Sequence, residues 1–327
     1  MQAEELQVVE AALGGTVVAA STLAGGFSHE TVLLTLADGQ VVARFGGPDP
    51  AVEAAVMAAA RPYAPVPEVL HVLPETASDG RARPVMILEY VHGTPLSQVL
   101  SENGNESGNG NESGNGDGLA ELGAEVGRVV AGISAVTFEG PGFFADARLT
   151  VAVDQPPWSR QLPEFATACM AADPARARLD GDVQRAWADL CAAHAPSLAR
   201  VDHHSRLVHA DINPKNLLVT HARDGWRVDA VLDWEFSFAG CPYGDAANML
   251  RFGAGYPASF LTGFRTGFAA HQPAGLPLPG DWAYLGRVLD MFALSDLVTR
   301  PTGHAVADEA AERIRHWVAE GVPDLAE

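Results

Sequence analysis

The chain has 327 residues, of which 47% are hydrophobic, and it carries a formal net charge of −20 at pH 7. A chain of this length and apolar content can bury a large core, and we expect two domains or one large bilobed domain. The negative charge excludes nucleic acid and anionic membranes as expected partners and mildly favours a cationic one, although a generally acidic surface is the simpler explanation of the total.

The N-terminus and the cysteines bear on the cellular compartment. The opening stretch, MQAEELQVVEAALGG, predicts an amphipathic helix and lacks the basic start and apolar run of a signal peptide. No later run has the length of a membrane-spanning helix, so we expect a cytoplasmic protein with no membrane partner. Cys169, Cys191 and Cys241 have no short metal-binding spacing and are odd in number, which predicts buried free thiols.

The N-terminal part of the chain predicts a small sheet with one helix. Apolar runs at 31–36 and 41–45 are joined by Asp38-Gly39, a strong hairpin signal. Residues 50–60 predict a helix, and the run VMILEYV at 85–91 predicts a buried strand.

A break in composition follows at residues 101–118, SENGNESGNGNESGNGDG. This segment has no apolar residue, so burial cannot offset the entropy that ordering would cost. We expect a disordered surface insertion.

Beyond the insertion, the chain is predicted to be mainly helical with one hairpin. Apolar residues recur at helical spacing in 118–134, 163–171 and 183–195, and again from Tyr243 onward. Residues 217–220 and 227–232 flank a turn and predict the hairpin. The expected fold class is α+β, with a small N-terminal antiparallel sheet plus helix and a larger, mainly helical C-terminal part.

Polar side chains that suit phosphoryl transfer converge at the two ends of that hairpin. HADINPKN, residues 209–216, precedes its first strand, and Asp233 in VLDWE follows its second strand. Phosphoryl transfer needs a carboxylate to orient or deprotonate the acceptor hydroxyl, and oxygen ligands to hold Mg²⁺ against the phosphates. Asp211 suits the first role, and Asn216 and Asp233 suit the second. Taken singly, such residues would be ordinary turn or cap residues.

LVHADINPKNLLV followed by VLDWE resembles the catalytic loop and metal motif of the aminoglycoside phosphotransferase family, which has a bilobed protein-kinase-like fold. The likeness covers most of the chain: GGFSHET resembles the phosphate-covering loop, VVARF the third strand, LEYVHG the hinge, and PYGDAANML the segment after the metal motif. Family members phosphorylate hydroxyls of antibiotics, choline-type amino alcohols and sugars. The resemblance implies a nucleotide-binding lobe and hinge at 1–92 and a catalytic, acceptor-binding lobe at 93–327.

The resemblance also implies a role for each matching residue. Asp211 would be the catalytic base, Asn216 and Asp233 would bind Mg²⁺, and ATP or GTP would be the phosphate donor. His209 and Asp245 would support the catalytic loop without reacting. The other nucleotide contacts would come from the phosphate-covering loop, Gly25, Gly26, Phe27 and Ser28, and from the backbone at the adenine edge, Glu89, Tyr90 and Val91.

The chain departs from the kinase pattern at two places. Arg44, nine residues before Glu53, stands where protein kinases have a lysine. Paired with Glu53, its forked guanidinium can still bind the α- and β-phosphates, whereas a solvent-facing arginine at a sheet edge is the alternative. The loop Ala24-Gly25-Gly26-Phe27 replaces the three-glycine pattern, which bears on how tightly the nucleotide is held.

Lys215 is the only lysine in the chain. It precedes the predicted metal ligand Asn216, and we assign it a catalytic role as a compact positive charge near the γ-phosphate or the acceptor oxygen. A solvated lysine, or one paired with a nearby carboxylate, is the alternative.

The acceptor is expected between Asp211 and the helical lobe, with walls from residues 157–179 and 286–300. Asp290 and Asp296 are six residues apart on one predicted helix, so at most one of them faces the acceptor. The preferred function is transfer of a γ-phosphate from ATP or GTP to a hydroxyl of a small molecule, an antibiotic before others. A metabolic amino-alcohol or sugar kinase and a catalytically silent nucleotide-binding module remain as alternatives.

Overall fold

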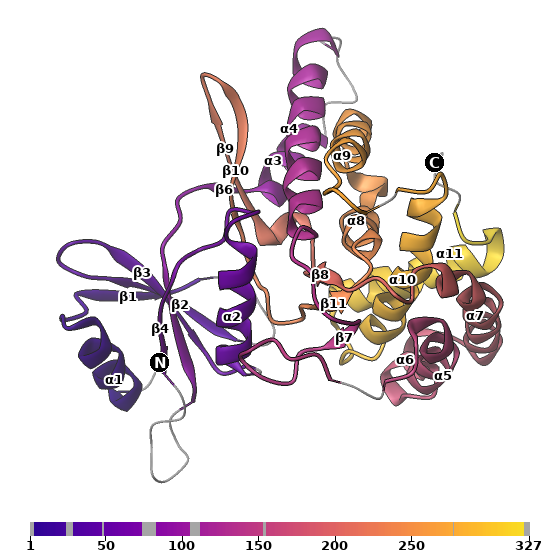
Figure 1. Ribbon diagram of the computed structural model, residues 1–327, viewed down its shortest axis with the longest axis horizontal. Helices are drawn as coiled ribbons and strands as arrows, with labels where there is room; N and C mark the ends of the chain where they lie inside the picture. The colour runs from indigo at the N-terminus through magenta and orange to yellow at the C-terminus, as the bar shows by residue number, and fades with distance from the viewer. Residues whose placement is uncertain are drawn as a thin grey trace.

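A computed structural model describes residues 3–23, 29–47, 49–73, 83–104, 112–152, 155–276 and 278–323. A sheet-rich N-terminal part adjoins a larger, mainly helical part, as the sequence predicts (Figure 1). Among the described residues, no helix is both long and apolar enough to cross a bilayer. Cys169, Cys191 and Cys241 are free thiols, as predicted, although Cys169 is only half-buried.

The N-terminal sheet is antiparallel and five-stranded, in the order β1-β2-β3-β5-β4. Its strands are β1 (Ala19–Thr22), β2 (Glu30–Thr35), β3 (Gln40–Phe45), β4 (Val69–Leu73) and β5 (Val85–Glu89). The predicted hairpin is confirmed, since Thr35 pairs with Gln40 and the Leu36 amide donates to the Gly39 carbonyl at 2.8 Å.

Two helices cover opposite faces of this sheet, α1 (Ala3–Leu13) and α2 (Pro50–Ala60). In β5, Val85 and Ile87 join the small core that includes Val9 of α1, whereas Met86 and Leu88 join the main core with residues of α2. This alternation follows from the two-residue period of a strand. Figure 1 shows α1 and α2 on either side of the strands.

Two small sheets connect the N-terminal sheet to the helices. In the first, β9 (Leu217–Ala222) and β10 (Gly225–Val231) form the predicted hairpin, and β6 (Thr94–Pro95) pairs with β9. The second has the order β7-β11-β8, with β7 at Gly142–Phe143, β8 at Arg206–Val208 and β11 at Phe238–Gly240. Because β8 ends at Val208 and β10 ends at Val231, these sheets position both halves of the candidate site.

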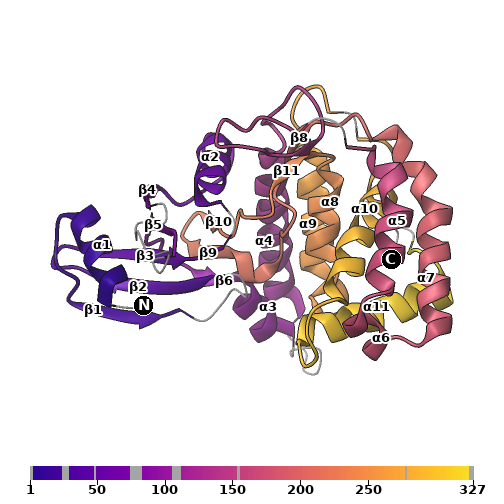
Figure 2. The same ribbon diagram turned by 90° about the horizontal axis from the view of Figure 1, so that it is seen from below.

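Most helices of the larger part stand side by side (Figure 2). They are α3 (Leu96–Gly104), α4 (Glu112–Ile133), α5 (Trp158–Met170), α6 (Asp173–Arg178), α7 (Gly181–His194), α8 (Tyr243–Leu250), α9 (Ala258–Ala270), α10 (Trp282–Leu297) and α11 (Ala305–Glu320). The predicted helices at 118–134, 163–171 and 183–195 correspond to α4, α5 and α7. The prediction of helices beyond Tyr243 is confirmed as well.

Glycines allow the backbones of α4 and α9 to contact each other directly. A Cβ atom at Gly127 would lie 2.3 Å from the carbonyl oxygen of Phe264, and one at Gly263 would lie 2.0 Å from that of Ala120. A Cβ atom at Gly123 or Gly267 would likewise meet the backbone of the facing helix. On each helix the glycines are four residues apart and therefore share one face.

The predicted disordered insertion at 101–118 is wrong for part of its length. Residues 101–104 belong to α3 and residues 112–118 belong to α4. The remaining residues of that prediction, 105–111, lie outside the described residues. Helix formation is cooperative, and Leu119 and Leu122, which are buried just beyond the segment, anchor α4 so that it extends into apolar-poor sequence.

Candidate active site

The loop between β8 and β9 carries the predicted catalytic residues, and His209 holds it in place. The buried His209 ring lies between two backbone segments: its Nδ1 accepts a hydrogen bond from the Asp211 amide at 3.2 Å, and its Nε2 donates to the Leu232 carbonyl at 2.9 Å. Burial lowers the pKa of His209 to about 4, so the ring is neutral at pH 7. It therefore ties the catalytic loop to the segment that contains Asp233.

Asp245, in the first turn of α8, braces the same loop. Its carboxylate accepts from the amides of His209 at 2.9 Å and Ala210 at 2.8 Å. Ala210 has a φ of 69°, an unfavourable conformation for a residue with a Cβ atom. The paired contacts to Asp245 offset part of that cost.

Asp211 is held by two side-chain amides. Asn216 donates to Asp211 Oδ2 at 2.8 Å, and Asn213 donates to Asp211 Oδ1 at 3.2 Å. The pKa of Asp211 is raised, chiefly by burial; the positive charge of Arg251 opposes this, and the negative charge of Asp233 adds to it. The result is an oriented carboxylate with more proton affinity than an exposed aspartate, as a general base requires.

Arg44 connects the N-terminal sheet to the metal motif. The side chain is 7% exposed, and its two terminal nitrogens contact Glu53 Oε1 at 2.5 Å and Asp233 Oδ1 at 2.6 Å. It also donates to His29 Nδ1 at 2.9 Å. The alternative of a solvent-facing arginine is therefore wrong: strand pairing places Arg44 on the inner face of β3, opposite Glu53 of α2.

Asn216 and Asp233 supply oxygen atoms of the kind that Mg²⁺ prefers. Asp233, at a left-handed φ of 68°, follows β10 and lies near enough to Asp211 for the two carboxylates to repel. A divalent cation would relieve that repulsion, so this donor set fits a magnesium site. Sequence reasoning missed two neighbouring residues, His29 and Glu235. One possible ligand atom from each of these residues and one from Asp233 all lie within 4.8 Å of one another. His29 follows the expected phosphate contact Ser28 in GGFSHET, and Glu235 lies two residues after the expected ligand Asp233 in VLDWE. This closeness in sequence was the available signal.

Lys215 lies next to the site residue Asn216 in sequence, but its side chain forms no hydrogen bond or ion pair with the described site residues. Its backbone amide donates to Asn213 Oδ1 at 2.9 Å in a short 3₁₀ turn, and its side chain is exposed. Within the described chain, its ammonium has no hydrogen-bond or ion-pair partner.

The residues expected around the nucleotide are only partly described. Gly25, Gly26, Phe27 and Ser28 lie outside the described residues. Glu89 ends β5; its side chain accepts from the Glu68 amide at 2.8 Å, and its own amide donates to the Glu68 carbonyl at 2.9 Å. Tyr90 and Val91 follow in the connection toward β6, and the Tyr90 ring packs edge-on against His92.

Neither predicted acceptor-side aspartate lines an open acidic wall. Asp290 is buried and bound to Arg251 and Asn248, whereas Asp296 pairs with Arg300 at 3.0 Å on the surface. The prediction that they face different sides of their helix is thus confirmed.

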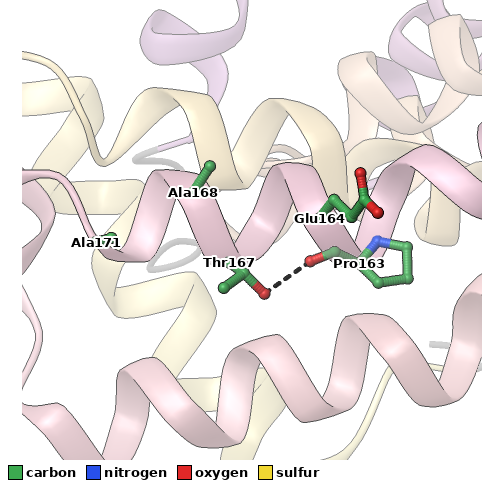
Figure 3. A pocket seen from close by; sticks show the side chains of 5 residues that line it. All are labelled: Pro163, Glu164, Thr167, Ala168 and Ala171. Carbon is green, nitrogen blue, oxygen red and sulfur yellow. Dashed lines mark hydrogen bonds between the residues drawn. The ribbon is translucent and has the colours of Figure 1, made fainter.

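The shallow cavity of Figure 3, about 460 Å³, follows one face of α5 within the predicted wall. Thr167 donates there to the Pro163 carbonyl at 2.8 Å, as the dashed line shows. None of the catalytic or metal-binding candidates lines this cavity, so it is not the phosphoryl-transfer site.

Comparison with known proteins identifies one family model and many solved structures that match this chain. The model of the phosphotransferase enzyme family matches residues 19–278. A thermostable mutant of aminoglycoside phosphotransferase APH(4)-Ia, in ternary complex with ADP and hygromycin B, is 18% identical with a TM-score of 0.65, covering 97% of this chain and 98% of that chain. APH(2")-IIia, in complex with GDP and kanamycin, is 15% identical with a TM-score of 0.67, covering 97% and 99%.

A more distant structure is that of a candidate fructosamine-3-kinase from Haemophilus somnus 129PT. It is 11% identical with a TM-score of 0.58 and covers 94% of this chain and 95% of that chain. At these identities the structures show a shared fold alone. Comparison with curated proteins gives no match.

Proposed function

Since the chain belongs to the phosphotransferase enzyme family and is a small-molecule phosphotransferase, we propose that it transfers the γ-phosphate of ATP or GTP to a hydroxyl of an antibiotic. The observation that carries the proposal is the arrangement of Asp211 beside Asp233, with Asn216 bonded to the first and Arg44 to the second. We keep residues 1–92 as the nucleotide-binding lobe and hinge and 93–327 as the acceptor-binding lobe. We place the reaction in the cytoplasm, where nucleoside triphosphates are abundant.

Asp211 acts as the base in this proposal. The acceptor hydroxyl oxygen forms a bond to the γ-phosphorus while the bond from that phosphorus to the β–γ bridging oxygen breaks. The hydroxyl proton passes to the Asp211 carboxylate, and the nucleoside diphosphate leaves. The amides of Asn213 and Asn216 keep the carboxylate oriented toward the acceptor.

Asn216 and Asp233 would hold Mg²⁺, which neutralises charge on the β- and γ-phosphates. Arg44, fixed by Glu53, would turn its second terminal nitrogen from Asp233 to the α- and β-phosphates when a nucleotide binds. Lys215 would approach the γ-phosphate or the acceptor oxygen from its exposed position.

The antibiotic acceptor rests on the relatives whose structures hold hygromycin B or kanamycin with a nucleotide. A sugar kinase is the second candidate, favoured by the likeness to a candidate fructosamine-3-kinase. The silent-module alternative loses its main support, because Arg44 is buried and paired with Glu53.

A product search tests the proposal. The purified protein is incubated with Mg²⁺ and ATP or GTP across a panel of hydroxylated antibiotics, sugars and amino alcohols, and products are identified by the mass of one added phosphate. Asp211→Asn is the matched control and should bind nucleotide normally while kcat falls by about 10² or more. Absence of any phosphorylated product, or near-normal turnover of the folded variant, overturns the proposal.

A further inference from the structure

His29, Asp233 and Glu235 come together between the two parts of the molecule, although His29 is far from the other two in sequence. His29 immediately precedes β2 of the N-terminal sheet, whereas Asp233 and Glu235 follow β10. One possible ligand atom from each residue lies within 4.8 Å of the other two. The side chains of His29 and Glu235 are 5% and 3% exposed, and that of Asp233 is 24% exposed, so an ion can approach from the Asp233 side. We call these three residues the histidine–carboxylate cluster.

Strand pairing explains why His29 lies beside Arg44. Thr31 of β2 pairs with Arg44 of β3, and side chains of paired residues lie on the same face of a sheet. His29 is two residues before Thr31, so the two-residue period of the strand, continued back to His29, puts its ring on that face as well. The contact between Arg44 Nη2 and His29 Nδ1, at 2.9 Å, agrees with this placement.

The contact with Arg44 also shows which nitrogen of the His29 ring carries a lone pair. A guanidinium has donor atoms only, so its hydrogen bond to His29 requires an unprotonated Nδ1. The same Nδ1 lies 3.6 Å from Glu235 Oε2. Two acceptor atoms therefore face each other across the cluster, and a cation is the kind of ligand that both can bind.

The Arg44 guanidinium supplies positive charge at the cluster in the described structure. Its Nη2 donates to Asp233 Oδ1 at 2.6 Å as well as to His29, and its Nη1 contacts Glu53 Oε1 at 2.5 Å. With Glu235, three carboxylates lie around this one guanidinium. Among these residues negative charge exceeds positive charge, and a divalent cation would reduce the excess.

The ligand atoms of the cluster favour a transition metal over Mg²⁺. Imidazole nitrogen and carboxylate oxygen together are typical ligands of Zn²⁺ and related first-row cations. Mg²⁺ prefers oxygen ligands and gives up its water reluctantly. Asn216 and Asp233 offer oxygen atoms only, so the two sites differ in chemistry. Asp233 has two carboxylate oxygens and can serve both.

We propose that His29, Asp233 and Glu235 bind a divalent transition-metal cation. The cation takes the position that Arg44 Nη2 holds between His29 and Asp233. This site goes beyond the proposed function, because it binds its cation without a nucleotide. Its effect on phosphoryl transfer rests on the proposed function: Arg44 stays paired with Glu53, and its released nitrogen binds the α- and β-phosphates. Cation and nucleotide therefore strengthen each other's binding.

The first test measures cation binding in the absence of nucleotide. Zn²⁺, Mn²⁺ and Mg²⁺ are titrated separately into chelator-treated protein, and binding is followed by calorimetry. We expect Zn²⁺ and Mn²⁺ to bind at least about tenfold more tightly than Mg²⁺. His29→Phe keeps a ring but loses the lone pair, and its affinity for both should fall by about a hundredfold, since loss of a residue that only supports a ligand already costs about 10–100-fold. Pulsed EPR of bound Mn²⁺ should detect an imidazole nitrogen in the parent and none in His29→Phe.

Three further variants complete this test. His221→Phe removes an exposed histidine on β9 and should bind like the parent. Glu235→Gln removes one negative charge at nearly constant size and should weaken binding, so it replaces His29→Phe if that variant does not fold. Arg44→Met should bind Zn²⁺ more tightly than the parent, because no guanidinium competes for the cluster. No binding by the parent, or parental affinity in folded His29→Phe or Glu235→Gln, overturns the site. Unchanged or weaker binding by folded Arg44→Met overturns the exchange with Arg44.

The second test measures the affinity for a non-hydrolysable ATP analogue at saturating Mg²⁺, with and without added Mn²⁺. Mn²⁺ should tighten binding to the parent by about fivefold or more. His29→Phe keeps Asn216 and Asp233, so the difference between it and the parent isolates the cluster; its affinity should not respond in this way. An equal response of the two proteins overturns the coupling. Turnover with Mg²⁺ by a parent that binds no transition metal overturns the site alone. Cation binding without a phosphorylated product from any acceptor would count against the proposed function and leave the site standing.

Discussion

Asp211 and Lys215 are four residues apart on one loop, and their surroundings differ sharply. The Asp211 carboxylate is held by two amides and has a raised pKa, whereas the Lys215 ammonium is exposed. A group that takes a proton needs a fixed position before the nucleotide arrives. A flexible cation can instead close on the phosphate after binding, at the cost of side-chain entropy.

Lys215→Met tests whether the only lysine contributes to catalysis. We expect kcat/KM to fall by about tenfold to a thousandfold, because one charge contact to the transition state is lost, with Lys215→Arg only partly restoring it. The measurement is steady-state kinetics at saturating Mg²⁺ on variants shown to be folded. A value within about threefold of the parent, under about 1 kcal/mol, would mean that this lysine is only a solvated surface residue.

His204 gives a prediction about stability alone. Burial is the main cause that lowers its pKa from 6.5 to about 4, and its Nδ1 has no hydrogen-bond partner in the described chain. The unfolded chain therefore binds a proton that the folded protein refuses, and this contribution to stability is lost as the pH falls from 6.5 to 4. In His204→Phe, the free energy of unfolding relative to the parent should rise on acidification from pH 7 to 4.5. A difference in urea unfolding that stays constant over that range would contradict the assignment.

At the scale of elements, the closest packing lies between α4 and α9. Carbonyl oxygens of each helix lie where a Cβ atom would stand if the facing glycine were any other residue. Glycine costs helix stability, about 1 kcal/mol relative to alanine, so these positions trade local helix propensity for contact between the helices. The region matters to the site because α8, which braces the catalytic loop through Asp245, lies beside α9 (Figure 2).

Gly127→Ala tests this contact, with Gly118→Ala as a matched control in the same helix. The new Cβ at Gly127 would meet Phe264 backbone at 2.3 Å, whereas the nearest atom at Gly118 is 3.8 Å away. We expect Gly127→Ala to lower the free energy of unfolding by about 1–3 kcal/mol, as overpacking does. Gly118→Ala should be neutral or stabilise by up to about 1 kcal/mol. Equal effects of the two substitutions in denaturant unfolding would show that the helices can separate freely.

At the scale of the whole molecule, one arginine joins the two parts. Arg44 belongs to the N-terminal sheet, and its contact with Asp233 crosses to the segment that follows β10. Burial of the Arg44–Glu53 pair fixes one end of this link. Nucleotide binding between these two parts should therefore stabilise the entire protein against unfolding.

Mg²⁺ with a non-hydrolysable ATP analogue should raise the melting temperature of the parent, since a ligand at about 100 times its Kd stabilises by about 2.7 kcal/mol. Chelation of the metal should remove most of this rise. Asp233→Ala, which loses a proposed ligand, should fold but show little Mg²⁺-dependent rise. Arg128→Met, which removes an exposed arginine paired with Glu125 on α4, should match the parent. A full Mg²⁺-dependent rise in folded Asp233→Ala would place the metal elsewhere.

Local patterns in the sequence determined much of the architecture. The hairpin around Asp38-Gly39, the helix at 50–60 and the hairpin after Asn216 depend on neighbouring residues, and the structure has all three. The grouping of Asp211, Asn216 and Asp233 followed from the same hairpin, because its two ends must meet. Short strands such as β4, β7, β8 and β11 were not predicted, since each owes its conformation to pairing with a distant segment.

Only the tertiary structure decided what surrounds each charge. The sequence determined a net charge of −20, yet packing buries the positively charged Arg251 against Asp290, where its charge opposes the rise in the pKa of Asp211. It also decided that Arg44 is buried against Glu53 and that part of 101–118 is helical. Electrostatic interactions depend on distance and burial, and these are set by residues far apart in the chain, so composition could not predict them.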